Sequence, residues 1–260
     1  MPAGDLLSLL PGLRQVWKDT GKKWIIHQRI DVEYGDMFEA YPGATYSIKN
    51  SEDKPVTMNF NTFFALRPLI KAQEYIEECV LWRGEDVDYD MDLLRQMDTT
   101  MPFGSISRWP WYIWPEMACD LAEPWLDVGK NQKAYKDCIL INRTERYNNM
   151  LISYSFLKKY GKKVFFIGLP EEHEKFCKQH YISIERARVN DFEDIAAAMR
   201  NCKLYIGNQS ACFQICEGLK TPRLLECCRQ MPNVIGCGPN FYDFINQKSL
   251  EYYVDKLYNN

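Results

Sequence analysis

Residues 204–226 constrain the fold of this chain more than any other part of its sequence. Residues 204–206 form a short apolar run that favours a buried strand, and the Gly-Asn pair that follows has the chemistry of a tight turn. Ser210 is a favourable N-cap for a helix that is expected to end near Lys220, before a second apolar strand. A strand, a turn, a helix and a strand in this order predict one unit of a parallel α/β sheet.

The start of this helix is a candidate anion site. The backbone amides of Ala211, Cys212 and Phe213 would lack intrahelical acceptors, and the positive end of the helix dipole would lie behind them. Such a cradle can bind phosphate without a metal or a lysine. The preceding turn, with Asn208, Gln209 and Ser210, belongs to the same candidate site.

Glu217 lies seven residues after Ser210, about two helical turns further on. It would therefore project from roughly the same face as the phosphate cradle, where a carboxylate could accept both ribose hydroxyls of a nucleotide. The alternative is an ordinary capped helix of an α/β protein. In that case a buried Glu217 would need a partner, whereas an exposed one would need none.

Two upstream segments show the same alternation of strand and helix. Residues 162–176 predict a strand that ends at Gly168 and a helix after it, and residues 189–202 predict a helix capped by Asp191. With residues 204–226, these segments resemble the C-terminal half of the ADP-heptose:lipopolysaccharide heptosyltransferase family, a branch of the GT-B glycosyltransferases. The matching stretches are IGLPEE, DIAAAMRNCKLYIGNQS and ICEGLKTPRLL, and the opening AGDLLSLLPGLRQVW is similar to the start of that family.

The chain departs from the family pattern at several positions. Gln209 stands where the family has Asp, Gln214 stands where it usually has His, and Leu169 replaces the second glycine of a Gly-Gly pair. These differences leave the identity of the donor open. Only residues 1–3 precede the Gly4-Asp5 pair, so the first strand of the family is expected to be absent or reduced to a stub.

The resemblance implies an α/β fold of the GT-B type, with two small Rossmann-like domains whose parallel sheets face a cleft. Residues 1–125 would form the acceptor-side domain and residues 126–246 the nucleotide-sugar-binding domain, with residues 247–260 as a helix that crosses back to the first domain. It also implies a glycosyltransferase that moves a sugar from a nucleoside diphosphate donor to a hydroxyl acceptor, with inversion and without a metal.

The implied reaction needs a base for the acceptor hydroxyl and groups that hold the leaving diphosphate. The resemblance makes Asp5 the candidate base, because it follows Gly4 at the start of a leucine-rich helix. The alternative is that Asp5 only caps this helix.

Candidates for binding the donor follow two other predicted strands. Arg143 and Arg146 come after the apolar run of residues 137–142 and are candidates for the diphosphate, with Thr144 as an additional hydroxyl donor. The alternative is that both arginines are solvated in an exposed loop. Gly168 would allow the nucleotide base to approach the backbone.

No cofactor is expected beyond the donor substrate, and no metal. Helix amides and arginines can neutralise a diphosphate, and the Asp-x-Asp spacing at residues 88–90 lies in the wrong half of the chain for the donor. Ten cysteines without a Cys-x-x-Cys pair, together with three histidines, argue against a zinc site. Most of the cysteines are expected to be buried thiols in a reducing compartment.

Composition indicates a cytoplasmic enzyme of one or two domains. The net charge of -3 provides no general attraction to nucleic acid or to an anionic membrane. No apolar run approaches the roughly 20 residues of a membrane span, and the start of the chain lacks the pattern of a signal peptide.

The acceptor is not apparent from the sequence. Residues 102–124 carry three tryptophans between prolines, and they form either a packed bridge between the domains or a platform for an acceptor ring. The acceptor is expected to be a saccharide or another hydroxyl compound. An alternative is a hydroxymethylated base in DNA, as for virus-type glycosyltransferases, with the tryptophans and arginines holding an extruded nucleotide. Two further alternatives are a non-catalytic nucleotide-sugar binding module and a sugar-nucleotide epimerase.

Overall fold

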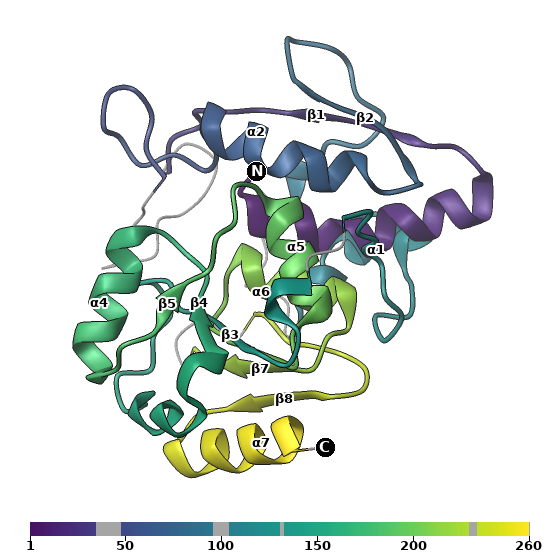
Figure 1. Cartoon of the computed structure of the whole chain (residues 1–260). Coiled ribbons are helices and arrows are strands. Elements are labelled where there is room, and N and C mark those ends of the chain that lie inside the picture. Colours follow the sequence, from purple (N-terminus) through teal and green to yellow (C-terminus); the bar gives the residue numbers. More distant parts are fainter. Residues whose placement is uncertain (35–47, 96–103, 131–132, 229–232, 260) are drawn as a thin grey trace.

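The computed structural model describes residues 1–34, 48–95, 104–130, 133–228 and 233–259 of the chain. Its α/β fold has two parallel sheets with helices between and around them (Figure 1). The smaller sheet pairs β1 (Trp24–Gln28) with β2 (Ile76–Leu81). The larger sheet has six strands in the order β5-β4-β3-β6-β7-β8.

Every neighbouring pair in the larger sheet is parallel. Its strands are β3 (Ile139–Asn142), β4 (Val164–Phe166), β5 (Glu185–Arg186), β6 (Leu204–Gly207), β7 (Arg223–Glu226) and β8 (Phe241–Phe244). The chain winds outward in one direction from β3 to β5, then crosses back to β6 and continues in the other direction. Doubly wound sheets of this kind bind ligands where the direction reverses, at the carboxyl ends of the two central strands. In this chain those strands are β3 and β6.

The helices follow the predicted order. They are α1 (Ala3–Thr20), α2 (Phe60–Lys71), α3 (Pro110–Ile113), α4 (Pro170–His180), α5 (Phe192–Asn201), α6 (Ala211–Leu219) and α7 (Gln247–Asn259). Short 3₁₀ helices span Met91–Arg95, Ile106–Arg108, Pro115–Met117, Lys133–Tyr135 and Ser155–Lys163. The predicted caps Asp191 and Ser210 are confirmed, because each side chain accepts a hydrogen bond from a backbone amide in the first turn of α5 or α6.

Alternating side chains of the large sheet enter two different hydrophobic clusters. Leu140 and Tyr205 belong to the cluster on the side of α5 and α6, whereas Ile141 and Ile206 belong to the cluster that includes α7. This alternation is the period-two pattern of a strand that is buried on both faces. The large sheet is therefore covered on both sides.

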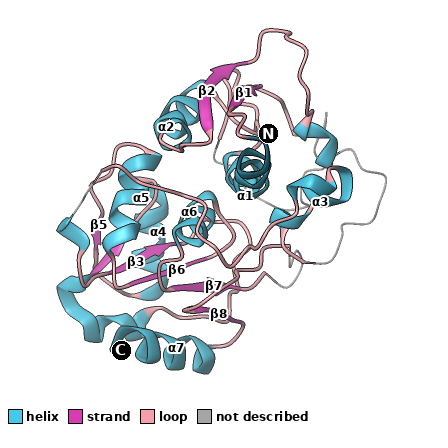
Figure 2. Ribbon diagram, turned by 90° about the vertical axis from the view of Figure 1, so that its right-hand side faces the viewer, coloured by secondary structure: helices cyan, strands magenta, loops and turns pink. Residues whose placement is uncertain are grey.

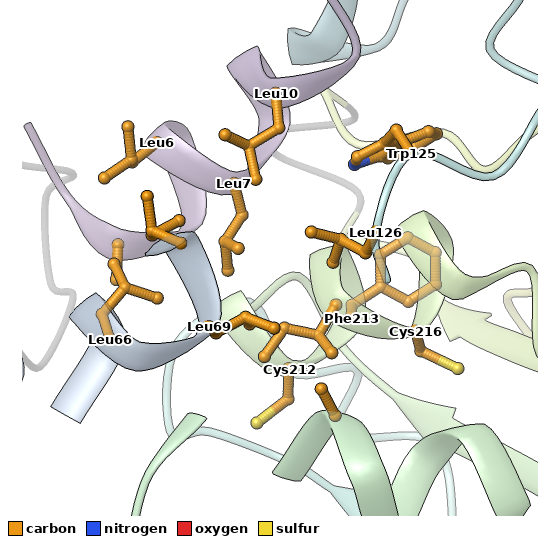
Figure 3. Close-up of a cluster of buried hydrophobic side chains, with 14 of the residues drawn as sticks. Leu6, Leu7, Leu10, Leu66, Leu69, Trp125, Leu126, Cys212, Phe213 and Cys216 are labelled. Carbon is orange, nitrogen blue, oxygen red and sulfur yellow. The ribbon is translucent and has the colours of Figure 1, made fainter. Parts of the chain in front are cut away.

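The first cluster also joins the N-terminal part of the chain to the large sheet. Helix α1 packs on α6 and α2 packs on α5, so these four helices form a double layer between the two sheets (Figure 2). Leu7, Leu10 and Leu69 meet Phe213 and Leu126 in this layer (Figure 3). One apolar core thus extends across residue 125, and the predicted domain boundary there remains a prediction.

Several expectations about individual elements are wrong. Helix α7 packs on β6, β7 and β8 and does not cross back to the N-terminal part, because Leu250, Val254 and Leu257 complete the cluster on the outer face of the large sheet (Figure 1).

The N-terminal helix also differs from its prediction. It begins at Ala3 with Pro2 at the N-cap position, so Asp5 lies in the first turn and is not the cap. Met1 and Pro2 form no strand. Among the described residues, no helix combines the length and the apolar character needed to cross a bilayer.

Candidate functional site

Asn208 ties together the loops that follow the two central strands. Its side chain is fully buried, and its Oδ1 accepts hydrogen bonds from the backbone amide and the hydroxyl of Thr144, at 3.1 and 3.3 Å. Its Nδ2 donates to the carbonyl oxygens of Thr144 and Arg146, at 3.0 and 2.6 Å. Asn208 and Thr144 therefore fix the backbone of the two loops. Their side chains bond to protein groups and not to a ligand.

Ser210 connects the start of α6 to the end of β3. Its Oγ accepts a hydrogen bond from the Phe213 amide at 3.2 Å and donates one to Oδ1 of Asn142 at 2.7 Å. The Phe213 amide is thus already used, contrary to the expectation that it faces outward. Within the part of the chain that the structure describes, the amides of Ala211 and Cys212 have no hydrogen-bond acceptor. These two donors remain for a ligand at the positive end of α6.

The N-terminus of α1 lies directly against this cradle. A Cβ atom added to Gly4 would lie 3.5 Å from the amide nitrogen of Ala211, so the backbones of the two helices approach closely. The first turns of α1 and α6 therefore converge, and each contributes the positive end of a helix dipole. Asp5 follows Gly4 and is the acidic residue in the first turn of α1. Gly4, the residue before Asp5, thus lies next to Ala211.

The loops after β3 and β4 border the same edge of the sheet. Arg146 is partly exposed and lies over the Tyr147 ring at 5.4 Å. Glu172, in the first turn of α4, accepts a hydrogen bond from the Leu169 amide at 3.0 Å. Burial raises the pKa of the Glu172 carboxyl, and the nearby Arg146 charge opposes this increase. Arg146 therefore lies near the Glu172 carboxylate at this edge.

Gly168 has a backbone that only glycine fits. Its φ is +155°, and an added Cβ would lie 2.6 Å from the Phe166 ring and 2.8 Å from the Glu172 carboxylate. The chain needs glycine here to turn from β4 into α4. Whether a nucleotide base approaches it remains a prediction.

The structure does not place Arg143 at the diphosphate site. Its guanidinium is buried and forms a two-point ion pair with Glu226, with Nε–Oε2 at 2.8 Å and Nη2–Oε1 at 2.9 Å. It also donates to the Asn149 carbonyl oxygen at 3.1 Å. Arg143 thus points toward β7 and stabilises the loop that follows β3. The alternative of a solvated arginine is therefore wrong for Arg143 as well.

Glu217 is also paired within the protein. Its carboxylate accepts hydrogen bonds from Lys220 Nζ at 2.5 Å, from the Cys237 amide at 2.9 Å and from Arg223 Nε. The side chain is only 3% exposed. The expectation that Glu217 accepts ribose hydroxyls is therefore wrong for this structure, because Lys220 and Arg223 occupy both oxygens.

The two glutamines that replace charged residues of the family are buried. Gln209 donates a hydrogen bond from Nε2 to Oδ1 of Asn233 at 2.7 Å. Gln214 is 4% exposed, and its Oε1 has no donor among the residues that the structure describes. Both side chains are neutral, so neither adds negative charge next to the amides of Ala211 and Cys212.

The thiols do not add reactive groups to this site. All ten cysteines are free, and burial raises the pKa of the Cys212 thiol to about 12. A thiol with this pKa stays protonated near neutral pH and is a poor nucleophile and a poor metal ligand. No cluster of histidine, cysteine or carboxylate side chains suited to a metal occurs in the described ranges.

The tryptophan-rich segment is a packed bridge and not a platform. Trp109 is 2% exposed, and the partly buried Trp111 and Trp114 pack against the same core as α1. Aromatic rings packed in this way stabilise the junction of the two halves.

Sequence analysis missed three residues that shape the site. Asn142, the last residue of β3, holds both Ser210 and the Ile167 carbonyl oxygen, to which its Nδ2 donates at 2.8 Å. A polar residue at the end of an apolar strand was its only signal. Gly4 and Glu172 carry no such signal, because their role depends on the approach of α1 and α4 to this edge of the sheet.

Comparison with known proteins supports the fold. No protein-family model and no curated protein matches the chain. A glycosyl transferase family 9 structure from Veillonella parvula is 10% identical, with a TM-score of 0.58 over 98% of this chain and 86% of that chain. The dodecameric, iron-containing glycosyltransferase TibC from enterotoxigenic Escherichia coli is 13% identical, with a TM-score of 0.55 over 100% of this chain and 74% of that one.

A third structure, E. coli heptosyltransferase WaaC with ADP, is 9% identical and has a TM-score of 0.48 over 99% of this chain and 97% of that chain. Identities this low establish the fold alone, and the first two structures carry that conclusion. The chain has the α/β fold of these two glycosyltransferase structures, and the GT-B fold that the resemblance of its sequence implies is confirmed.

Proposed function

We propose that this chain is a glycosyltransferase that binds a nucleoside diphosphate sugar where the N-termini of α1 and α6 converge. The observation that carries this proposal is the contact between Gly4 and Ala211. We infer from this contact that the candidate base, Asp5, acts beside the amides of Ala211 and Cys212. A base and a set of anion-binding donors at one point are what sugar transfer from a diphosphate requires.

In the proposed reaction, the hydroxyl oxygen of the acceptor attacks the anomeric carbon of the donor. The bond between this carbon and the diphosphate oxygen breaks, Asp5 takes the proton of the hydroxyl, and the nucleoside diphosphate leaves with the bonding electron pair. The amides of Ala211 and Cys212 stabilise the negative charge that develops on the diphosphate, aided by the two helix dipoles. Arg146 at the rim adds a positive charge, and attack from the face opposite the diphosphate inverts the anomeric carbon.

The fold supports this assignment, since both structures above a TM-score of 0.5 are described as glycosyltransferases. The proposal includes independence from metal, because amides and an arginine supply the positive charge. For the acceptor, a saccharide or similar hydroxyl compound is favoured over modified DNA. The DNA alternative required tryptophans and arginines that hold an extruded base, but Trp109 and Arg143 are buried.

The test measures release of nucleoside diphosphate from a panel of ADP-, GDP- and UDP-sugars. Asp5→Asn is expected to lower turnover by about 100-fold or more, since general bases contribute roughly that much, while nucleotide affinity stays within about twofold. Asp19→Asn is the matched control, because Asp19 lies at the exposed end of the same helix, where its carboxylate accepts hydrogen bonds from Gln15.

The outcomes separate the alternatives. Binding of nucleoside diphosphate without release from any sugar donor would indicate a binding module. A changed sugar without transfer would indicate an epimerase. Absence of both binding and release across the panel would contradict the proposal.

A further inference from the structure

Strand β1 has an open edge. The Trp24 amide donates to the Tyr75 carbonyl oxygen at 3.0 Å, and the Gln28 carbonyl oxygen accepts from the Trp82 amide at 3.0 Å. In a parallel pair every second residue faces the partner strand, so Trp24, Ile26 and Gln28 bond to β2. The peptide groups of Ile25 and His27 point the opposite way, and among the described residues neither group has a hydrogen bond outside the β1–β2 ladder.

A cavity of about 780 Å³ lies along this edge. Every residue from Lys23 to Arg29 lines it, although neighbouring side chains of a strand point to opposite faces. Because the cavity contacts residues whose side chains lie on both faces of the strand, it must extend along the strand backbone. Its floor is the apolar face of α1, with Leu6, Leu9 and Leu13, and its outer wall is the segment of residues 82–92 that follows β2. The groove thus has an apolar floor and peptide groups of the open strand edge along one side.

The outer wall of the groove is acidic. Five carboxylates lie within residues 85–92 and line the cavity, against the cations Lys23 and Arg29. Arg29 is bound to Asp92 at 2.7 Å. Asp86 and Asp88 are exposed and have no ion pair within the part of the chain that the structure describes. The groove therefore favours a basic ligand.

We propose that the open edge of β1 binds an extended peptide segment of a partner protein, which adds a strand to the small sheet. Its main chain would bond to the peptide groups of Ile25 and His27, as in other complexes formed by strand addition. Alternating apolar side chains would pack on Leu6 and Leu9, and basic side chains between them would face Asp86 and Asp88. The five residues of β1 can pair with about 17 Å of extended peptide. This inference does not depend on the proposed sugar transfer.

A basic partner peptide is favoured over a second copy of this chain. The wall of the groove and the whole chain both carry net negative charge, -3 for the chain, so that self-association through this edge would bring like charges together.

The test uses a capped six-residue peptide of alternating lysine and valine and the full chain. Binding is measured by calorimetry, and hydrogen exchange reports the amides of Ile25 and His27. Ile25→Pro removes one donor on the open edge and leaves the β1–β2 ladder intact. Ile25→Thr is the matched control, because it keeps the amide and suits a strand. A second control is the same peptide with N-methyl groups on alternate residues, used on the unaltered protein.

We expect the peptide to slow exchange at Ile25 and His27, and Ile25→Pro to weaken binding about tenfold, as the loss of a hydrogen bond predicts. Ile25→Thr should change affinity less than about threefold, a difference of under 1 kcal/mol. Equal binding of the N-methylated peptide, or binding without protection of these amides, would overturn the proposal. Protection that increases with protein concentration alone would show that a second copy occupies the edge and would overturn it as well.

Discussion

Glu226 shows how single residues in this chain are committed to structure. It is fully buried and accepts hydrogen bonds from Arg143 twice, from the Asn149 amide and from the Tyr154 hydroxyl. Burial of a carboxylate is tolerated when its acceptor positions are filled in this way. The guanidinium of Arg143 consequently stabilises the sheet and is not available to a ligand.

Removal of the Glu226 charge is expected to destabilise the protein strongly. Glu226→Gln leaves the Arg143 guanidinium buried without a counter-charge, which costs about 3–5 kcal/mol in the free energy of unfolding. Asp255→Asn removes the partner of Lys159 in a half-exposed ion pair and should cost less than about 1 kcal/mol. Urea denaturation of both variants checks this, and similar losses would contradict it.

His180 makes stability depend on pH. Burial, together with the nearby Arg143 charge, lowers its pKa to about 4, from about 6.5 in the unfolded chain. Between these values the unfolded chain binds a proton that the folded protein does not. The free energy of unfolding therefore decreases as pH falls from about 6.5 to about 4, by up to about 1.4 kcal/mol per pH unit.

His180→Gln should reduce this slope between pH 6.5 and pH 4 and leave the slope above pH 7 unchanged. Urea denaturation at several pH values provides the measurement, compared with Lys178→Gln, an exposed residue in the last turn of the same helix. An unchanged slope in His180→Gln would show that His180 is not the titrating group.

Helix starts are the elements on which the candidate site depends. Helices α5 and α6 both begin with a side-chain cap, from Asp191 and Ser210, but only α6 directs its first amides to the edge where α1 begins. A side-chain cap therefore stabilises both helices, but it also orients amides for a ligand only where a neighbouring helix completes the site.

Removal of the two caps should lower stability to a similar extent but should affect ligand binding at only one of the two helices. Ser210→Ala and Asp191→Ala should each lower the free energy of unfolding by about 1 kcal/mol. Only Ser210→Ala should also weaken binding of a nucleoside diphosphate, because it loosens the amides of Ala211 and Cys212. Calorimetric titration of both variants checks this, and equal affinities would contradict the proposed donor site.

The whole molecule is joined by the core between the two sheets. Leu7 of α1 is fully buried beside Leu126 and Phe213 from the other half of the chain (Figure 3). The contact surfaces of the two halves are therefore apolar, and neither half would be expected to keep its structure with this surface exposed to water.

Truncation of this core should affect the protein as one unit. Leu7→Ala is expected to cost about 2–5 kcal/mol. It should shift the unfolding curves from circular dichroism and from tryptophan fluorescence together. Leu151→Ala, at a side chain that is 73% exposed, should change stability by less than about 0.5 kcal/mol. Two separate transitions, with only one shifted by Leu7→Ala, would show that the halves unfold independently.

Local signals in the sequence were sufficient for much of the fold. The strand before Gly207, the Ser210 cap and the strand after Pro222 were all predicted, because apolar runs and capping residues act over a few neighbouring positions. The period and the caps also predicted a parallel α/β sheet. The small sheet and the extent of α2 were less apparent, since their limits depend on packing.

The sequence by itself determined the order of strands and helices and the cradle at the start of α6. Only the tertiary structure decided which polar residues remain for a ligand. Arg143 and Glu217 have the chemistry of donor-binding residues, but a buried charge must be paired. Arg143 therefore pairs with a residue far away along the chain, and Glu217 pairs with one across a turn. Gly4 approaches Ala211 for the complementary reason, because the apolar face of α1 is buried against α6.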